Sequence, residues 1–357
     1  MSRQVLAVAQ AFKGSMAAAE VSEAWTRAIE DAAARAIVLV ASDGGDGLLE
    51  ALAGRLTQVT QHTVTGPLKK SVHAKVGWFS PISAVIESRL ACGLSLLRDR
   101  ERDPLTTTSR GVGELILQAV ELGAREIFVG LGGSATADCG LGMARSWGWG
   151  FADSEGNSVA ASYQLERLST VSPGIPPGVS LTGLCDVSNP LTGPNGAVIY
   201  VPQKGGSEDE CAILERGWVQ LARIMAQMCG RDYSQIPGTG AAGGIGFGLM
   251  AFAGGELVSG SDWVLQTLGF EDALATADLV VVGEGKFDET SLWGKLSGNV
   301  LRRASQTGVP AVLVSPQVAA ADTFGAHIVT GGAIWDREEL YRRSREGIAH
   351  ALSLLAP

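Results

Sequence analysis

The chain has 357 residues, of which 46% are hydrophobic and 18% are charged, a composition typical of an ordered globular protein with two domains of about 150 residues each. Its net charge of −9 and its lack of a basic run exclude a nucleic-acid backbone as the main partner. Residues 1–15 have too short an apolar run for a signal peptide.

The cysteines and histidines indicate a cytoplasmic protein without a zinc site. Five cysteines are an odd number without CxxC spacing, which favours thiols in a reducing compartment, and the four histidines are scattered. The uncharged span 235–255 is long enough to cross a bilayer, but it contains eight glycines and a proline. That composition predicts a binding loop, so we expect no membrane partner.

Two strand–loop–helix units open the chain. Residues 5–9 and 37–41 are predicted strands, and each leads through a glycine loop, AFKGS (11–15) or SDGGDG (42–47), into a helix. Leu49, Leu52 and Leu56 form the apolar face of the second helix. This rhythm is typical of a doubly wound parallel sheet, which binds ligands at the carboxyl ends of its strands.

The middle of the chain has a different texture. Residues 62–66, 72–79 and 83–88 are predicted to form a meander of short strands, and Thr108 or Ser109 caps the helix that follows. Residues 126–142, EIFVGLGGSATADCGLG, read as a buried strand that ends in glycines beside Ser134 and Thr136. Backbone N–H groups at such a turn can cradle an anion. A tight turn without a ligand is the alternative.

Two further segments precede the last part of the chain. Residues 181–185 form a predicted strand that ends in CDVSNPLTG. Ser207 and Glu210 form a capping box for a long helix, whose expected core face is Leu214, Trp218, Leu221, Met225 and Met228.

The βα rhythm returns near the C-terminus. Residues 279–282, 311–314 and 327–329 are predicted strands, GEGKFDE (283–289) follows the first of them, and Asp336 with Glu339 caps a final helix. With the two N-terminal strands this makes five. We therefore predict a doubly wound α/β domain built from residues 1–60 and 270–357, with residues 61–269 as an inserted α+β domain.

The polar residues at the predicted strand ends supply the parts that phosphoryl transfer needs. These parts are a nucleotide cradle, a Mg²⁺ ion held by one or two carboxylates, cations over the phosphate and a proton acceptor. Lys13 is the best single cation, and Asp43, Asp186 and Asp288 are candidate metal ligands or bases. Each of them also has an ordinary explanation as a turn or capping residue.

Standard nucleotide motifs do not account for the chain. Residues 238–243, GTGAAG, fit the dinucleotide pattern GxGxxG, but no strand precedes them and no acidic residue ends a strand about 20 residues later. A Walker A sequence and a GxSxG elbow are both absent.

Laid side by side, these loops resemble those of the glycerate kinase family. The matching segments cover roughly residues 5–315 in the family's order and include FKGS, SDGGDG, ESRLACGLSLL, GLGGSATADCGLGM, CDVSNPLTGPNGA, PQKGG, PGTGAAGGIGFGLMAF and ADLVVVGEGKFDETSLWGK. The resemblance implies a flavodoxin-like domain with an inserted second domain. It also implies ATP, Mg²⁺ and phosphorylation of glycerate, most often at the 2-hydroxyl.

The chain departs from the family pattern at several positions. Gln10 and Ala11 stand where the family usually has aspartate and serine, and Ala137, Asp138 and Cys139 replace the usual Asn-Asp-Gly. Such losses in site loops point to an altered substrate or to lost activity.

We therefore expect an ATP-dependent kinase of D-glycerate or a close 2-hydroxy acid. Its expected catalytic residues are Lys13, Asp43, Asp186 and Asp288, with Asp186 and Asp288 also as metal ligands. The expected substrate- and nucleotide-binding residues are Gly14, Ser15, Gly132, Gly133, Ser134, Asn189, Lys204, Gly240, Gly243 and Glu284.

Two other functions remain open at this point. One is a non-catalytic relative that binds glycerate or nucleotide without turnover, and the other is an NAD-linked oxidoreductase that uses residues 238–243. The number of chains in the assembly is also open, and a homo-oligomer is compatible with the sequence.

Overall fold

The computed structural model describes residues 2–12, 14–292 and 294–355. They form two compact units. Unit 1 consists of Met1–Asp43, Glu50–Arg55 and Ser259–Pro357, and unit 2 consists of Gly44–Leu49 and Leu56–Val258. Unit 1 therefore contains both ends of the chain.

Unit 1 is built on a parallel sheet of five strands in the order β15-β13-β11-β1-β2. The strands are β1 (Gln4–Ala9), β2 (Arg35–Val40), β11 (Leu279–Gly283), β13 (Ala311–Val314) and β15 (His327–Val329). Numbered along the chain within this unit, the order is 2-1-3-4-5, the order of a flavodoxin-like doubly wound sheet. The predicted fold class and its five strands are confirmed.

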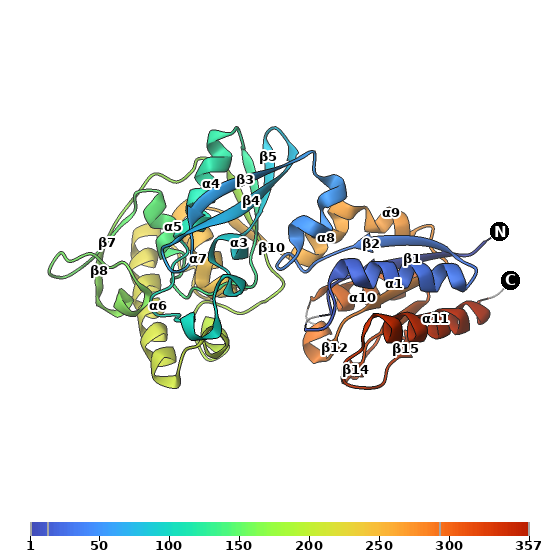
Figure 1. Ribbon diagram of the computed structural model, residues 1–357. Helices are drawn as coiled ribbons and strands as arrows, with labels where there is room; N and C mark the ends of the chain where they lie inside the picture. Colours follow the sequence, from blue (N-terminus) through green and yellow to red (C-terminus); the bar gives the residue numbers. More distant parts are fainter. Residues whose placement is uncertain (1, 13, 293, 356–357) are drawn as a thin grey trace. The chain divides into compact units, whose positions relative to one another are not determined.

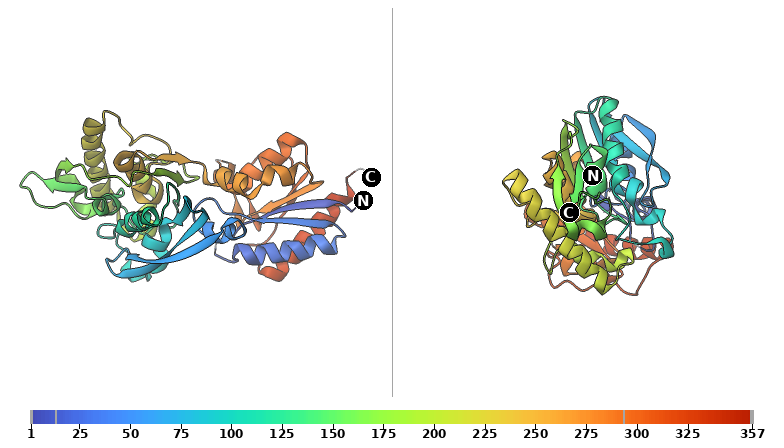
Figure 2. Two further views of the ribbon diagram at one scale, coloured as in Figure 1. Left: turned by 90° about the horizontal axis from the view of Figure 1, so that it is seen from above. Right: turned by 90° about the vertical axis from the view of Figure 1, so that its left-hand side faces the viewer.

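Helices cover both faces of this sheet, as the left view of Figure 2 shows. On one face α1 (Ala18–Asp31) packs against α11 (Arg337–Ser353), and the Trp25 indole donates to Ser344 Oγ at 3.0 Å. On the other face α10 (Leu296–Thr307) packs on β11, β13 and α8 (Gly260–Leu268). The short helix α9 (Phe270–Leu274) follows α8.

Unit 2 contains a mixed sheet of six strands in the order β10-β9-β6-β5-β4-β3. The strands are β3 (Gln58–Thr65), β4 (Ser71–Ser80), β5 (Ser83–Glu87), β6 (Glu126–Gly130), β9 (Ser180–Leu184) and β10 (Glu256–Val258). The first three form antiparallel pairs, whereas β5, β6, β9 and β10 run parallel. The predicted meander is therefore confirmed as β3-β4-β5, and β5 also pairs with the parallel strand β6.

The core of unit 2 lies between this sheet and its helices, which Figure 1 labels. The helices are α3 (Ser88–Cys92), α4 (Arg110–Glu121), α5 (Leu141–Ser146), α6 (Glu208–Cys229) and α7 (Ala241–Ala253), and a hairpin joins β7 (Gly150–Asp153) to β8 (Leu168–Ser172). Within this core the Phe252 ring packs against the rings of Trp149, Phe151 and Phe247.

The predicted helix starts have mixed outcomes. The capping box is confirmed because Ser207 Oγ accepts from Glu210 N and the Glu210 carboxylate accepts from Ser207 N. Asp336 likewise accepts from Glu339 N at 2.9 Å. Ser109 is the N-cap residue of α4 and its side chain donates to Asp138, whereas the hydroxyl of Thr108 accepts from the Arg110 amide at 3.2 Å.

Two predicted helical features are wrong. The helix expected around Leu49, Leu52 and Leu56 is only the four-residue α2 (Leu48–Ala51), followed by a 3₁₀ turn. Met228 does not belong to the core face of α6, because 38% of its surface is exposed near the C-terminal end of that helix.

The glycine-rich span 237–255 is mainly a helix rather than the predicted loop. Most of α7 is buried, and its first turn contains three consecutive residues, Ala242, Gly243 and Gly244, in left-handed conformation. Gly243 is required there, since a Cβ would lie 1.9 Å from the Thr136 carbonyl oxygen. No helix among the described residues is both long and apolar enough to cross a membrane.

Candidate active site

A cavity of about 390 Å³ opens at the carboxyl ends of the strands of unit 1. Gln10 follows β1, Asp43 follows β2, Glu284 follows β11 and Gln317 follows β13 at its wall. The chain reverses its direction of strand addition between β1 and β11, and open α/β sheets bind ligands at such a switch point. The remaining lining residues include Ala11, Gly14, Ser15, Lys286, Asp288, Lys295 and Ile334.

Glu284 has the most perturbed environment in this cavity. Its Oε1 is buried and has no hydrogen-bond partner among the described residues. Burial raises the pKa of the Glu284 carboxyl, whereas the hydroxyl groups of Ser291 and Ser297 and the charge of Lys295 oppose that shift. A carboxyl in this state is a weaker acid than usual and a better proton acceptor once it is ionised.

Asp288 lies in the same cavity in the opposite electrostatic state. Its Oδ1 accepts from the Thr290 amide at 3.0 Å and from the Thr290 hydroxyl at 2.6 Å, and its Oδ2 lies 3.3 Å from Lys286 Nζ. These contacts, led by the Thr290 hydroxyl, lower the pKa of Asp288. Lys295 Nζ donates to the Thr290 hydroxyl and so completes the network. Asp288 is therefore held as a carboxylate with hydrogen bonds to both of its oxygens.

Gln10 ties the end of β1 to the end of β11. Its side-chain amide donates to the Gly283 carbonyl at 3.0 Å and to Ser297 Oγ at 2.6 Å. Ser297 stands in the first turn of α10. The amide thus connects three elements beside Glu284 without adding a negative charge.

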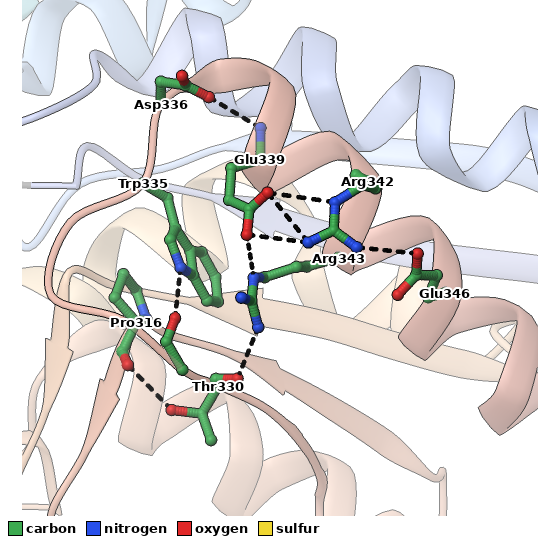
Figure 3. A network of polar contacts seen from close by, with 9 residues as sticks. Pro316, Thr330, Trp335, Asp336, Glu339, Arg342, Arg343 and Glu346 are labelled. Carbon is green, nitrogen blue, oxygen red and sulfur yellow. Dashed lines mark hydrogen bonds and ion pairs between the residues drawn. The ribbon is translucent and has the colours of Figure 1, made fainter.

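Another part of the cavity wall comes from the turn after β13 and from the loop between β15 and α11, which Figure 3 shows. The Thr330 hydroxyl donates to the Pro316 carbonyl at 3.0 Å, and the Trp335 indole donates to the Gly331 carbonyl at 2.7 Å. Arg343 on α11 donates to the Thr330 carbonyl at 3.0 Å and packs on the Trp335 ring. These bonds fix the loop that carries Ile334, whose side chain is 74% exposed at the cavity wall.

In unit 2 the glycine loop after β6 presents backbone donors. Among the described residues, the N–H groups of Gly132, Gly133 and Ser134 have no acceptor. Gly133 has φ +60°, and its neighbour Arg89 is anchored through Nε to Glu87 at 2.7 Å and to Asp46 at 3.5 Å. Consecutive unpaired N–H groups beside a guanidinium make a donor set that can bind a phosphate or carboxylate oxygen, and the Asp46 carboxylate lies next to the same loop.

A buried cation supports that loop from within unit 2. Lys204 is 3% exposed, and its ammonium donates to Ser134 Oγ at 3.1 Å and to the Thr136 carbonyl at 2.6 Å. Burial lowers the pKa of Lys204 to about 8, while the charges of Cys92, Asp138 and Cys139 oppose the shift. Asp138 is also buried, which raises its pKa, although it accepts hydrogen bonds from Ser109 and from the amides of Gly140 and Gly142.

The other predicted site residues of unit 2 lie around the ends of β9 and α7. Asp186 is half-buried in the loop after β9. Asn189 donates to the Asn195 carbonyl and accepts from the Tyr200 hydroxyl, so its amide holds a loop together. The Gly240 amide donates to the Asn189 carbonyl at 3.0 Å.

The structure thus assigns the predicted residues to two places. Gly14, Ser15, Asp43, Glu284 and Asp288 share the cavity of unit 1. Gly132, Gly133, Ser134, Asn189, Lys204, Gly240, Gly243 and Asp186 belong to unit 2. Lys13 lies outside the described residues.

Sequence reasoning missed some residues at both places. Arg89 stands beside the glycine loop, and its signal was its position two residues after the buried Glu87 at a strand end. Ser297 was missed because its neighbours Gln10 and Glu284 are distant in sequence.

The carboxylates of the described residues bear on whether this protein can hold a divalent cation. No three of their His, Cys, Asp or Glu side chains form a cluster that could hold a metal. Mg²⁺ that accompanies a nucleotide needs only one or two carboxylates, because phosphate oxygens and water complete its octahedron. Asp43 and Asp288 provide carboxylates of this kind in the cavity of unit 1.

The five-stranded parallel sheet with a charged cavity at its switch point defines a doubly wound, flavodoxin-like α/β protein. The model of the glycerate kinase family matches residues 5–349, so the chain belongs to the glycerate kinase family, and it is a kinase that acts on an alcohol group. The resemblance found in the sequence is confirmed.

Individual relatives agree with this assignment. The chain is 37% identical over 319 residues to the glycerate 2-kinase of Escherichia coli K12, covering 87% of this chain and 84% of that one. It is 34% identical over 325 residues to the glycerate kinase of Bacillus subtilis 168, covering 88% and 85%. A crystal structure of a Salmonella typhimurium LT2 protein assigned as glycerate kinase 2 matches with a TM-score of 0.80 and 32% identity, covering 99% of this chain and 97% of that one.

Proposed function

We propose that this kinase transfers the γ-phosphoryl group of ATP to the 2-hydroxyl of D-glycerate and forms 2-phosphoglycerate and ADP. The observation that carries the proposal is the 37% identity, over 87% of this chain, to a protein named glycerate 2-kinase. The cavity of unit 1 supports it, because carboxylates and lysines meet there at the site where such sheets bind ligands.

In this proposal the cavity of unit 1 holds the reacting groups. Lys286 and Lys295 line it together with Ser15 and Asp43, and the ammonium groups would attract the charge that spreads over the transferring phosphoryl oxygens. Lys13 stays a predicted cation for the same purpose. Phosphoryl transfer needs little covalent chemistry from the protein, so orientation and electrostatic stabilisation should supply most of the acceleration.

We assign nucleotide phosphate binding to the donor set of Gly132, Gly133 and Ser134. Their unpaired N–H groups and the nearby Arg89 guanidinium suit phosphate oxygens. Lys204 would act on this loop from inside by holding Ser134 and Thr136, rather than by direct contact with solvent. Asn189, Gly240 and Gly243 would shape the same part of unit 2.

Mg²⁺ is proposed as the metal that accompanies ATP. When bound, it neutralises phosphate charge and orients the γ-phosphoryl group. Asp43 and Asp288, which line the cavity of unit 1, are the proposed ligands. Asp186, the other ligand predicted from the sequence, belongs to unit 2. Asp288 suits this task because its pKa is lowered and it stays ionised at neutral pH.

Two coarser expectations accompany this function. We propose that the two compact units are the two domains of the protein. Their main boundaries lie between residues 55 and 56 and between residues 258 and 259, whereas the sequence predicted them after residues 60 and 269. Five free cysteines support a cytoplasmic location, where thiols stay reduced.

A coupled assay of ADP release tests the function with D-glycerate, ATP and Mg²⁺. L-Glycerate and glycolate serve as alternative acceptors, and a reaction without acceptor measures background ATP hydrolysis. Phosphorus NMR of the product distinguishes 2-phosphoglycerate from 3-phosphoglycerate. We expect D-glycerate to be the best acceptor, and no turnover at millimolar substrate would overturn the proposal.

A further inference from the structure

A glutamate of the cavity, rather than Asp288, has the surroundings of a proton acceptor for the acceptor hydroxyl. Three acidic residues, Asp43, Glu284 and Asp288, line the cavity of unit 1. A proton acceptor needs an oxygen that is free to bind a proton, and a pKa close to the working pH.

Asp288 does not meet these needs. Both of its oxygens already accept hydrogen bonds or pair with a cation: Oδ1 is bonded to the Thr290 amide and hydroxyl, and Oδ2 lies 3.3 Å from Lys286 Nζ. Protonation would break this network. Asp288 is therefore fixed in its charged form, which suits a permanent negative charge rather than proton exchange.

Glu284 differs from Asp288 in both respects. It directly follows the central strand β11 at the switch point of the sheet, and its Oε1 has no hydrogen-bond partner among the described residues. An unsatisfied buried carboxylate oxygen is costly, and an oxygen at the wall of a cavity can gain a partner from a bound hydroxyl group. Burial raises the pKa of Glu284, which makes its carboxylate more basic than an ordinary one.

We propose that Glu284 is the catalytic proton acceptor of the reaction. This inference rests on the proposed function. As the hydroxyl oxygen of the acid forms its bond to the γ-phosphorus, its O–H bond breaks and the proton passes to the Glu284 carboxylate. The bond between the γ-phosphorus and the bridging oxygen breaks at the same time and releases ADP. Glu284 returns the proton to water after the product leaves.

The charged neighbours of Glu284 define its expected pH profile. Lys295 favours its ionised form and Asp288 opposes it, and Asp43 and Lys286 are the other described charged residues of the cavity wall. Since the carboxylate is the active form, kcat of the wild type should fall as the pH drops below the raised pKa of Glu284. Above that pKa the rate should level off.

The test compares wild type with Glu284→Gln and Glu284→Asp at saturating ATP, Mg²⁺ and D-glycerate over a range of pH. Glu346→Gln is the matched control, because this carboxyl lies on α11 with 58% of its side chain exposed and does not line the cavity. We expect Glu284→Gln to lower kcat by about 10² to 10⁴-fold with KM changed less than about threefold. It should also lose the acidic limb of the profile. Glu284→Asp should retain part of kcat, and Glu346→Gln should match wild type.

A second measurement separates chemistry from folding. Thermal unfolding of Glu284→Gln should show a Tm equal to or above that of wild type, because the amide removes a buried charge. A Glu284→Gln protein that folds and keeps kcat within threefold, or that raises KM without lowering kcat, overturns the proton-acceptor role alone. An inactive wild type overturns the proposed function, and the role of Glu284 falls with it.

Discussion

Replacement of Gly243 by alanine tests how tightly α7 is packed on the glycine loop of unit 2. Gly243 has φ +69°, and an added Cβ would lie 1.9 Å from the Thr136 carbonyl oxygen and 2.8 Å from Lys204 Nζ. Gly254 ends the same helix with φ +66°, but its Cβ would meet nothing within 4 Å. The two positions therefore share a backbone conformation and differ only in their surroundings.

The expected loss of stability follows from the left-handed backbone conformation and from the contacts of the added Cβ. A left-handed alanine costs about 1–2 kcal/mol, and this is the whole penalty at Gly254. Overpacking adds about 1–3 kcal/mol at Gly243, because the clashing Thr136 carbonyl belongs to the backbone and cannot turn away as a flexible side chain can. Gly243→Ala should thus destabilise the protein by about 2–5 kcal/mol, compared with about 1–2 kcal/mol for Gly254→Ala.

Urea unfolding followed by tryptophan fluorescence measures both variants under the same conditions. Trp218 is a suitable reporter because its indole donates to the Ala137 carbonyl at 2.9 Å, one residue from Thr136. Because Thr136 and Ser134 move with the strained contact, Gly243→Ala should also raise KM for ATP. Equal losses of stability in the two variants would refute the close packing of α7 on this loop.

Three further substitutions have defined outcomes. Lys204→Met removes a buried ammonium whose pKa is about 8 in the folded protein. Because Lys204 keeps its proton to higher pH in the unfolded chain, the stability of the wild type relative to this variant should rise by about 2 kcal/mol between pH 8 and 9.5. A stability difference that stays constant over this pH range would contradict the lowered pKa. Arg343→Ala removes the bond to the Thr330 carbonyl and should raise KM for the acid more than it lowers kcat, with Arg345→Ala as the control, and unchanged kinetics would show that the loop is held without it. Arg89→Ala should raise KM for ATP about tenfold and weaken its salt dependence, whereas an unaffected KM would remove Arg89 from nucleotide binding.

Local sequence signals predicted the fold of unit 1 well. Short β-branched runs such as residues 279–282 form buried parallel strands, because only such residues fill a sheet that is covered on both faces. Ser207 and Asp336 were correct as helix starts, since a capping side chain needs only residues three positions away. These features depend on neighbours in the sequence.

Features that depend on distant partners were predicted less well. The glycines of residues 237–255 indicated a loop, but tertiary packing of α7 against Thr136 and Cys139 makes them a helix with a left-handed first turn. Lys204 was predicted to bind substrate or nucleotide, and nothing in the sequence indicated that its ammonium is buried and donates to Ser134. The sequence also did not predict that the pKa of Glu284 is raised and that of Asp288 is lowered. The pKa of Asp288 is lowered by its contacts with Thr290 and Lys286, whereas that of Glu284 is raised by burial.

The strand order of unit 1 has a consequence for synthesis of the protein. The strand β1 pairs with the edge strand β2 and with the central strand β11, and β11 begins only at Leu279. All strands of the six-stranded sheet, by contrast, are encoded between Gln58 and Val258. A nascent chain therefore carries β1 and β2 half-paired for more than two hundred residues of translation, while the insert can complete its own sheet first. Ribosome-bound chains that stop before β11 should consequently be the species most dependent on chaperones.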